Sequence, residues 1–353
     1  MRDEREAARS LRMPLRAFIE VVGVQNLSLV IALLIVVVLI ASQNSKFFLP
    51  QNLLNIGQNV SVVGLVAVVE TVVIVGGGLD ISVGSVAGIA SVAAALAVVN
   101  TGLPVAGLVA GVMAGLLAGI VNGLVITVGR VNAVIATLAT LSAFRGIAFL
   151  IAPEGKPVGV INPSFNYIGS GRLGVGTSAI PVSLVILLVV ALVVHVFLRY
   201  SDLGRAVYAM GGNPIAARLS GINLTRMRVG VYALSGAVAG MAGIVVTART
   251  FSGQPESGTS GLELEAITAA FLGGCALQGG KGTVAGTMLA VFLIGTLSNG
   301  MSLLGIATFY QLVAKGLLLV LAVAIQQWRL ARAERARTRL ATPAAVATAG
   351  LPR

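Results

Sequence analysis

The residues of this chain that could do chemistry are few, and most lie within or beside long apolar runs. The ionisable side chains inside such runs are Glu70, Arg145, Glu263, Glu265 and Lys315. A charge in such a segment is costly, so each group needs a charged partner or a water-filled cavity. Counting residues from the ends of the runs predicts two structural pairs, Glu70 with Lys315 and Arg145 with Glu265.

Uncharged polar residues on or near the same runs could hydrogen-bond a neutral solute. We expect a minority to face a polar route and the rest to bond neighbouring helices. The candidates for the route are Asn59, Asn122, Asn132, Thr137 and Gln278. Asp80 has two interpretations, because it can cap the segment Ser82–Ser85 or face the route; its flanking Gly and Ser residues favour the cap.

No pattern in the chain indicates a catalytic centre, a metal site or a nucleotide site. Cys275 is the only cysteine and His195 the only histidine, so neither predicts metal binding. Gly280-Lys281-Gly282 resembles part of a phosphate-binding loop, but Cys275 stands where the leading Gly should be and Gly282 where Ser or Thr should follow. We therefore expect no catalytic residue, metal or cofactor in this chain.

The elements that position these residues are predicted to be membrane helices. The 353 residues are 57% hydrophobic and 10% charged, and the mean hydropathy of +0.98 leaves too few polar residues to cover a soluble protein. Ten runs could cross a hydrocarbon core of about 30 Å. They are Leu27–Ala41, Val60–Val75, Val83–Val99, Leu103–Val128, Val131–Ala152, Ile180–Leu198, Val229–Val246, Leu262–Leu277, Val284–Leu297 and Ile306–Ile325. The predicted fold is an all-α polytopic membrane protein with about ten transmembrane helices.

The positive charges predict the orientation of these helices. A net charge of +12 would suggest nucleic acid as a partner of a soluble chain, but in a membrane protein the question is on which side the charge lies. With the N-terminus inside, most of the 24 Lys and Arg residues are cytoplasmic, as the positive-inside rule requires. Both termini are then cytoplasmic, with a basic tail 1–26, a membrane domain 27–325 and a basic tail 326–353.

Glycine patterns predict where the helices break and where they pack closely. Two of the stretches rich in the 44 glycines lie between apolar runs, at Gly76–Ser85 and Gly273–Gly282. Each is either a helix break that faces a polar route at membrane depth or a tight cytoplasmic turn. Gly111, Gly115 and Gly119, at four-residue spacing, predict a helix face that packs closely against another helix.

A basic segment, residues 199–228, separates two apolar runs on the predicted cytoplasmic side. Asn213 can cap a helix, Pro214 suits its first position, and Gly221 follows where a left-handed residue is favoured. The segment therefore predicts a short helix, Ile215–Ser220, held at a fixed angle. It is either a docking surface for a cytoplasmic partner or an ordinary cytoplasmic loop that contains a capped helix.

Taken together and in this order, four segments resemble the membrane permease of bacterial ABC sugar importers of the ribose and monosaccharide type. They are GGGLDISVGS at Gly76–Ser85, GRVNAVIATLATLSAFRGIAFL at Gly129–Leu150, the stretch Gly204–Ile222 that ends in AMGGNPIAARLSGI, and AFLGGCALQGGKGTVAGT at Ala270–Thr287. The resemblance covers the chain from Asn52 to Ile325. It implies a subunit of the bacterial inner membrane that forms the pathway for a monosaccharide or similar polyol by alternating access.

The resemblance also implies the partners of the chain. They are a second permease copy, a cytoplasmic ABC ATPase that binds ATP and Mg²⁺, an extracytoplasmic sugar-binding protein and the lipid bilayer, and nucleic acid is not among them. The chain itself would catalyse no reaction. An ATPase-coupling role is implied for Gly204, Arg205, Gly211, Gly212, Asn213, Pro214, Ala216, Ala217, Arg218 and Gly221.

Other functions stay open at this point. An ion-coupled secondary transporter would use the broken helices and the charges inside the membrane without an ATPase. An ABC permease for branched-chain amino acids would need helix ends or charges in the pathway for a zwitterion. A non-transporting scaffold fits poorly with two Gly-rich breaks, and the particular sugar is not identified.

Overall fold

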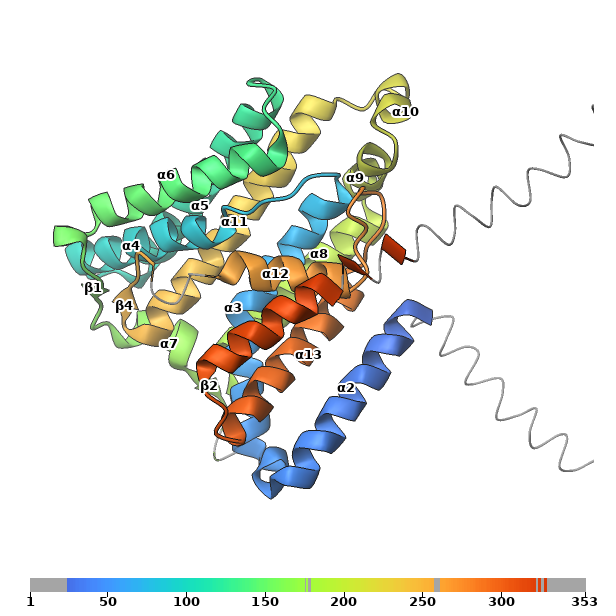
Figure 1. The fold of residues 1–353 in the computed structure, drawn as a ribbon. Coiled ribbons are helices and arrows are strands. Elements are labelled where there is room, and N and C mark those ends of the chain that lie inside the picture. The colour runs from blue at the N-terminus through green and yellow to red at the C-terminus, as the bar shows by residue number, and fades with distance from the viewer. Residues whose placement is uncertain are drawn as a thin grey trace, which may run out of the picture.

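The computed structural model describes residues 24–174, 176, 179–256, 261–321, 323–324 and 327–328. Of the two predicted tails, only residues 24–26 and 327–328 are described; the rest of both tails lies outside the described residues. The long helices are α2 (Val24–Gln43), α3 (Pro50–Val75), α4 (Val83–Thr101), α5 (Pro104–Thr127), α6 (Ala133–Ile151), α8 (Val182–Tyr200), α11 (Leu224–Thr250) and α13 (Val284–Leu303) (Figure 1). The shorter ones are η1 (Ser45–Phe48), η2 (Pro153–Gly155), α7 (Pro163–Ser170), α9 (Asp202–Gly212), α10 (Pro214–Leu219), α12 (Leu262–Leu272) and an apolar helix Thr308–Leu321.

Two small antiparallel pairs of strands complete the described elements. β1 (Val158–Gly159) pairs with β4 (Ser252–Gly253), and β2 (Arg172–Leu173) pairs with β3 (Ile180–Pro181). Each strand has only two residues, so the pairs serve as short connections between the ends of helices. The fold is all-α, as predicted.

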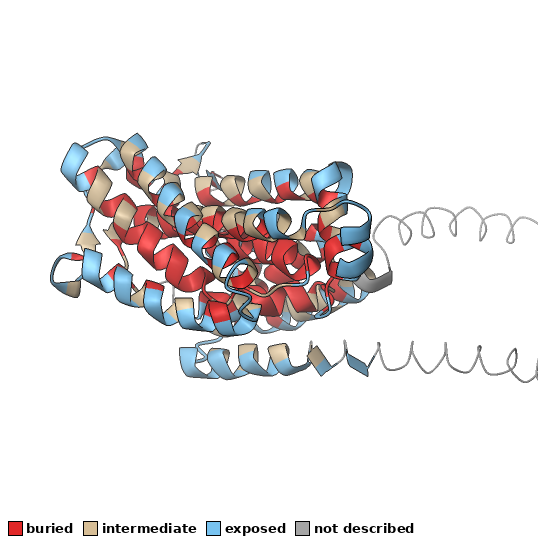
Figure 2. Cartoon of the chain, turned by 90° about the horizontal axis from the view of Figure 1, so that it is seen from above, coloured by how far each residue is buried: buried red, intermediate tan, exposed pale blue. Residues whose placement is uncertain are grey.

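The core of the bundle is built around α3. Its second half, Leu65–Val75, is fully buried, and α3 as a whole packs against α8, α11, α12 and α13. Figure 2 shows buried residues concentrated in the centre of the bundle and exposed residues along the outer helices. The C-terminal half of α3 is therefore the fixed reference against which other segments are placed.

The outer helices present apolar side chains on their exposed faces. α5 shows this clearly, because its glycines and its large apolar residues each recur every four residues on opposite faces. The buried face carries Gly107, Gly111, Gly115, Gly119 and Gly123, and the exposed face Val105, Val109, Met113, Leu117 and Val121. An exposed apolar stripe of this length is suited to lipid or to another membrane helix.

Eight of the described helices are long and apolar enough to cross a membrane, namely α2 to α6, α8, α11 and α13. These helices make the chain a multi-pass membrane protein. The predicted continuous span Leu262–Leu277 is wrong, because α12 has 11 residues and so a length of about 16 Å. The last predicted run holds the apolar helix Thr308–Leu321, which is shorter than a full crossing within the described residues.

An extended segment that includes β4 and Gln254 precedes α12 in the chain and packs against α4. Gly253 lies so close to α4 that a Cβ there would be 2.5 Å from the Cβ of Ala95. The N–H of Gln254 donates to the Oγ of Ser91, in the middle of α4 (2.8 Å). This irregular backbone is buried in protein, which is the condition for irregular backbone at membrane depth.

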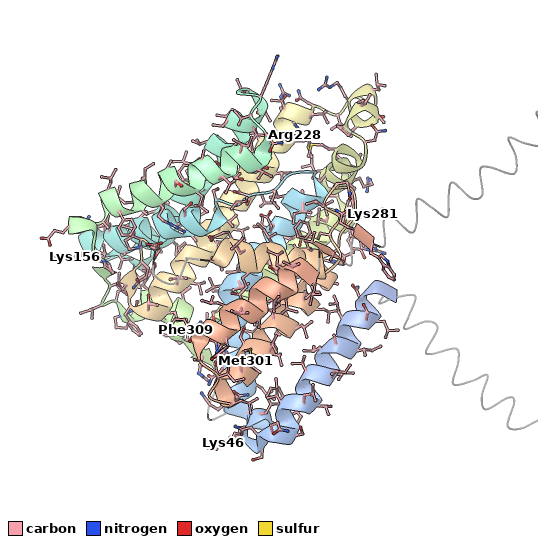
Figure 3. The ribbon with its side chains drawn as sticks, in the orientation of Figure 1. Lys46, Lys156, Arg228, Lys281, Met301 and Phe309 are labelled. Atoms are coloured by element: carbon pink, nitrogen blue, oxygen red, sulfur yellow. The ribbon has the colours of Figure 1, made fainter. Side chains whose placement is uncertain are left out.

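The two ends of the bundle carry different sets of cations. Figure 3 shows Arg228 and Lys281 at one end and Lys46 and Lys156 at the other. α9, α10 and the first residues of α2 lie at the end that carries Arg228 (Figure 1). This arrangement agrees with the charge-based topology, which makes that end cytoplasmic; the side itself stays a prediction.

The predicted close packing of the Gly111–Gly119 face is confirmed in the contact between α5 and α11. A Cβ on Gly115 would lie 2.2 Å from the carbonyl O of Gly236, and a Cβ on Gly236 would lie 2.1 Å from that of Gly115. A Cβ on Gly119 would lie 2.1 Å from the carbonyl O of Tyr232. The backbones touch, so no larger residue fits.

Two alanine substitutions on α11 test this contact. Gly236→Ala should lower the free energy of unfolding by about 1–3 kcal/mol, because the new methyl group forces the helices apart. Gly230→Ala is the matched control, since nothing lies within 4 Å of the place its methyl group would take. Thermal unfolding in detergent measures both, and equal midpoints for the two variants would contradict the packing described.

Candidate functional site

The predicted short helix of the basic segment is present as α10. The side-chain oxygen of Asn213 accepts hydrogen bonds from the N–H groups of Ile215 (3.1 Å) and Ala216 (3.0 Å). Pro214 takes the first helical position, where its missing N–H costs nothing. The start of α10 is therefore fixed by local hydrogen bonds, as predicted.

The end of α10 is also as predicted, and its surface is largely open. Gly221 has a φ of 87° and its N–H donates to the carbonyl O of Arg218 (3.0 Å). Ile215 and Leu219 are 73% and 84% exposed. Ala217 is buried against its own chain, so of the two alanines only Ala216 is available to a partner.

α9 has no counterpart among the predicted elements. The Oγ of Ser201 accepts from the N–H of Gly204 (2.9 Å), and Asp202 in the first turn forms an ion pair with Arg205. A Cβ on Gly204 would lie 2.2 Å from the carbonyl O of Phe197, so only glycine lets α9 turn back so tightly on α8. The sequence signal was present in Ser201-Asp202, a cap followed by an acidic first turn.

Three pairs of glycines from distant parts of the chain meet at the C-terminal end of α9. We call this contact the glycine junction; it consists of Gly76–Gly77, Gly211–Gly212 and Gly279–Gly280. The N–H of Gly280 donates to the carbonyl O of Val75 at the end of α3 (2.8 Å). A Cβ on Gly211 would lie 1.9 Å from that same oxygen. The junction joins α9 to both Gly-rich breaks.

A side chain of α9 adds a second link to the later break. The hydroxyl of Tyr208 donates to the carbonyl O of Gly282 (2.8 Å). Burial raises the pKa of Tyr208 above its ordinary value, so the hydroxyl stays a donor at neutral pH. The second break and α9 are thus held together by both a backbone contact and a side-chain hydrogen bond.

A buried polar network lies directly behind the first break. One carboxylate oxygen of Asp80 accepts from the N–H (3.0 Å) and the Oγ (2.6 Å) of Ser82, and the other accepts from the Oγ of Ser235 (3.1 Å). The N–H of Asp80 donates to Glu70 (3.1 Å), and the amide of Asn122 donates to the Oγ of Ser82 (2.7 Å). All five side chains are fully buried.

This geometry supports the capping interpretation of Asp80. The side chain satisfies the start of α4 and does not line the cavity described below. Glu70 lies five residues before the end of α3, so Asp80 is about 7.5 Å inside that end. The first Gly-rich stretch therefore folds back into the bundle instead of forming an exposed turn.

The other polar candidates are scattered. Thr137 is buried and donates within α6 to the carbonyl O of Ala133 (2.9 Å), Asn59 accepts from Arg249, and Gln278 is exposed in the second break. Asn132 caps α6, accepting from the N–H of Val134 (2.9 Å), and it also lines the cavity. The structure brings Asp80 and Asn122 together through Ser82, whereas Asn59 and Gln278 lie elsewhere.

Sequence reasoning missed two polar residues of the network, Ser235 and Tyr232. The hydroxyl of Tyr232 donates to the carbonyl O of Leu79 (3.2 Å), next to Asp80. Both residues lie three apart on α11, so they share a face. A polar pair on one face of an apolar span was the signal that could have located them.

A cavity of about 920 Å³ opens between α10, the start of α11 and the connection from α5 to α6. Gly76, Gly77 and Gly78 form part of its wall, so it borders the glycine junction. Its polar lining includes Arg130, Asn132, Thr225, Arg218 and Arg228. It is the place where the basic segment 199–228, the first break and a sequence-predicted polar residue come together.

Both predicted ion pairs are wrong in their partners. Lys315 bonds Glu265 (2.9 Å) and Arg145 bonds Glu256 (3.4 Å), while Glu70 bonds the backbone of Asp80. Residue counting gives depth along a helix but not the direction in which a side chain points. Glu265, at the start of the short α12, therefore replaces Glu70 as the partner of Lys315.

A family model described as "Branched-chain amino acid transport system / permease component" matches residues 52–323 of the chain. The chain belongs to this permease family. The match covers α3 from its third residue and every described helix from α4 to α13, and thus the glycine junction, the network and the cavity. No solved structure matches the permease significantly.

Several sugar permeases are similar to this one. The ribose import permease of Bacillus subtilis is 40% identical over 306 residues, which are 86% of this chain and 93% of that protein. The ribose import permease of Escherichia coli K12 is 40% identical over 303 residues, 84% of this chain and 91% of that protein. The L-arabinose transport system permease of the same strain is 36% identical over 278 residues, which are 79% of this chain and 83% of that protein.

The permease's described residues contain no group of three or more His, Cys, Asp or Glu side chains that could hold a metal ion. Cys275 is buried beside Thr287, with its sulfur 3.9 Å from the hydroxyl.

A double-mutant cycle tests the corrected ion pair. Lys315→Met and Glu265→Gln should be coupled by about 1–2 kcal/mol in the free energy of unfolding, because each mutation alone strands a partly buried charge. The matched control replaces Glu265→Gln by Glu70→Gln, which should show no coupling with Lys315→Met. Coupling to Glu70 in place of Glu265 would restore the pair predicted from depth.

Two neighbouring glycines of α9 test the junction. Gly211→Ala should lower the thermal unfolding midpoint of the permease, because its methyl group would collide with the carbonyl O of Val75. Gly212→Ala should leave the midpoint unchanged or raise it slightly, since the nearest atom is 3.9 Å from its Cβ. If both variants unfold at the wild-type midpoint, the junction is looser than described.

Proposed function

We propose that this permease forms the translocation pathway for a monosaccharide or similar polyol in an ATP-driven importer. Its family is that of transport-system permeases, and the similar proteins named above are importers of ribose and L-arabinose. A pentose or related solute presents hydroxyl groups, which neutral hydrogen-bonding side chains bind without a charge. The observation that carries the mechanism is the glycine junction, which links an exposed coupling element to both helix breaks.

The partners are inferred from the motifs of the sequence and from the exposed surfaces of the helices. No nucleotide-binding motif is present in the sequence, so ATP and Mg²⁺ belong to a cytoplasmic ATPase subunit. A second copy of the permease completes the pathway, and an extracytoplasmic sugar-binding protein delivers the solute. The exposed apolar stripes of the outer helices are available to lipid and to that second copy.

The mechanism is alternating access driven through α9 and α10. α10 docks on the ATPase through its exposed surface, which includes Ile215, Ala216 and Leu219. When the ATPase subunits close on ATP, α10 moves and α9 moves with it. Because Gly211 and Tyr208 hold the two breaks, this motion reaches the ends of α3 and α12.

The glycines make this transmission direct. Backbone in contact with backbone leaves no flexible side chain to absorb a displacement. The first break leads straight into the Asp80 network, so a shift at Gly76–Gly77 reorients the start of α4. The pathway between the two copies then changes the side to which it opens.

The branched-chain amino acid alternative has the description of the family in its favour. It would need a cationic group or a free helix start facing the pathway for the carboxylate of the amino acid. The start of α4 is already occupied by Asp80, and the similar sugar permeases favour a monosaccharide. Lys315, Arg145 and Glu265 have ion-pair partners, which leaves these three groups less available for ion coupling.

The lever role of α10 is tested by the double variant Asn213→Gly/Pro214→Gly. It removes both N-cap hydrogen bonds, worth about 1 kcal/mol, and frees the backbone at the hinge between α9 and α10. In proteoliposomes with the ATPase and binding protein, ATP hydrolysis should persist while solute uptake falls at least severalfold. Membrane insertion and folded yield should stay at the wild-type level.

α7 provides a matched control, because it begins with the same dipeptide. Asn162 caps α7 by accepting from the N–H of Phe165 (3.1 Å), and Pro163 follows it. The variant Asn162→Gly/Pro163→Gly should not change the number of ATP molecules hydrolysed per solute imported. Unchanged solute uptake in the Asn213→Gly/Pro214→Gly variant would contradict the lever role of α10.

A further inference from the structure

The cavity beside α10 has an unusual distribution of charge. Three arginines from three different elements line it: Arg130 from the connection between α5 and α6, Arg218 from α10 and Arg228 from α11. Its lining contains no Asp or Glu. Figure 3 shows Arg228 at the start of α11, at the same end of the bundle as α10.

These arginines have no anionic partner within the described part of the chain. The ion pairs there involve Arg145, Lys156, Arg205 and Lys315 as cations, and none of these lines the cavity. Guanidinium groups that share a cavity repel one another, and an anion between them relieves that repulsion. The positive charge of the lining is therefore not balanced by a carboxylate of the described residues.

The chemistry of the lining indicates which anion fits. A guanidinium offers paired N–H donors that match the oxygens of a phosphate group, and several arginines around one phosphate give strong, charge-assisted hydrogen bonds. The amide of Asn132 and the hydroxyl of Thr225 add uncharged polar groups. Val73, Ile126 and Leu224 supply an apolar wall beside them, which suits the organic part of a phosphate ester.

We propose that this cavity binds a phosphate group, carried by an anionic phospholipid or by a soluble phosphate ester. The cavity lies at the predicted cytoplasmic end, where both sources occur at the membrane surface. A phosphate held by Arg218 and by Arg130 or Arg228 would bridge α10 to the membrane helices. The binding site does not depend on the proposed function, but this effect on the coupling helix rests on it.

The bound phosphate would affect coupling to the ATPase, because α10 is otherwise held mainly by the residues next to it in sequence. Only Ala217 of α10 is buried. A bound phosphate would fix α10 against Arg130 and Arg228, and its release would free the helix to follow the ATPase. Occupancy of the cavity is thus a means of regulating the lever.

The first experiment measures phosphate binding to the purified full-length permease in an uncharged detergent. The thermal unfolding midpoint is followed as inorganic phosphate is added, with sodium chloride at equal ionic strength as the reference. We expect a saturable rise with phosphate only. Arg130→Gln and Arg228→Gln should each weaken the apparent affinity about tenfold, the loss expected for one charge-assisted contact.

Arg226→Gln is the matched control, because Arg226 is exposed, lies two residues from Arg228 and does not line the cavity. It should leave the phosphate affinity unchanged. Arg228→Lys keeps the charge and shows that any loss is not due to misfolding, because it should retain part of the affinity. All variants must elute as the same species as the wild type.

The second experiment separates the two sources of phosphate. The permease is placed in nanodiscs of phosphatidylcholine with or without phosphatidylglycerol, released into native mass spectrometry and examined for retained lipid. Retention of phosphatidylglycerol that is lost in Arg130→Gln and Arg228→Gln supports the site and assigns it to lipid. A response to inorganic phosphate without such retention supports the site and assigns it to a soluble ester.

Two results would overturn the proposal. They are no response to either probe and an equal loss of binding in Arg226→Gln. A failure of the proposed function would leave the binding result intact, since neither experiment contains the ATPase.

Discussion

The hydrogen bond from the N–H of Gly280 to the carbonyl O of Val75 is the contact on which the arrangement of this permease depends. It fastens the second Gly-rich break to the end of α3, the most enclosed helix of the bundle. Gly211 fits against the same carbonyl only because it has no side chain. The end of α3, the end of α9 and the loop after α12 therefore share one point of contact.

Placing the Asp80 network behind this point has a physical consequence. Asp80, Ser82, Asn122 and Ser235 are buried together, and buried polar groups are costly when their hydrogen bonds are lost. Two acceptors in the network, the second carboxylate oxygen of Glu70 and the amide oxygen of Asn122, lack a hydrogen-bond partner among the described residues. These two buried acceptors carry a cost in free energy that the hydrogen bonds of the rest of the network must outweigh.

The features predicted correctly from the sequence are those that a few neighbouring residues specify. The cap at Asn213, the first-turn proline and Gly221 specify α10 locally, so its bounds are right to within one residue. The glycine spacing on α5 predicts a close contact because a single helix face carries it. The membrane helices follow from long apolar runs, although the runs do not reveal that α12 is short.

The features that sequence reasoning missed depend on how distant segments meet. Depth along a helix can be counted, but the facing of Lys315 toward Glu265 depends on where α12 lies in the bundle, which the residues of α12 do not specify by themselves. The glycine junction combines residues about 70 to 200 positions apart, each of which reads as an ordinary turn by itself. Arg130, Arg218 and Arg228 likewise become a cluster only when α10 folds back toward the connection between α5 and α6.

The central claim is that α10 and the second Gly-rich break move as one body, and a distance measurement tests it most directly. Spin labels on Ile215 and Leu277, both exposed, would report their separation in the complex with the ATPase, with unlabelled permease in excess so that labelled pairs lie within one copy. The account predicts one narrow distance distribution that is the same with and without ATP. A separation that changes by several ångströms between the two states would show that the junction does not transmit the motion of α10.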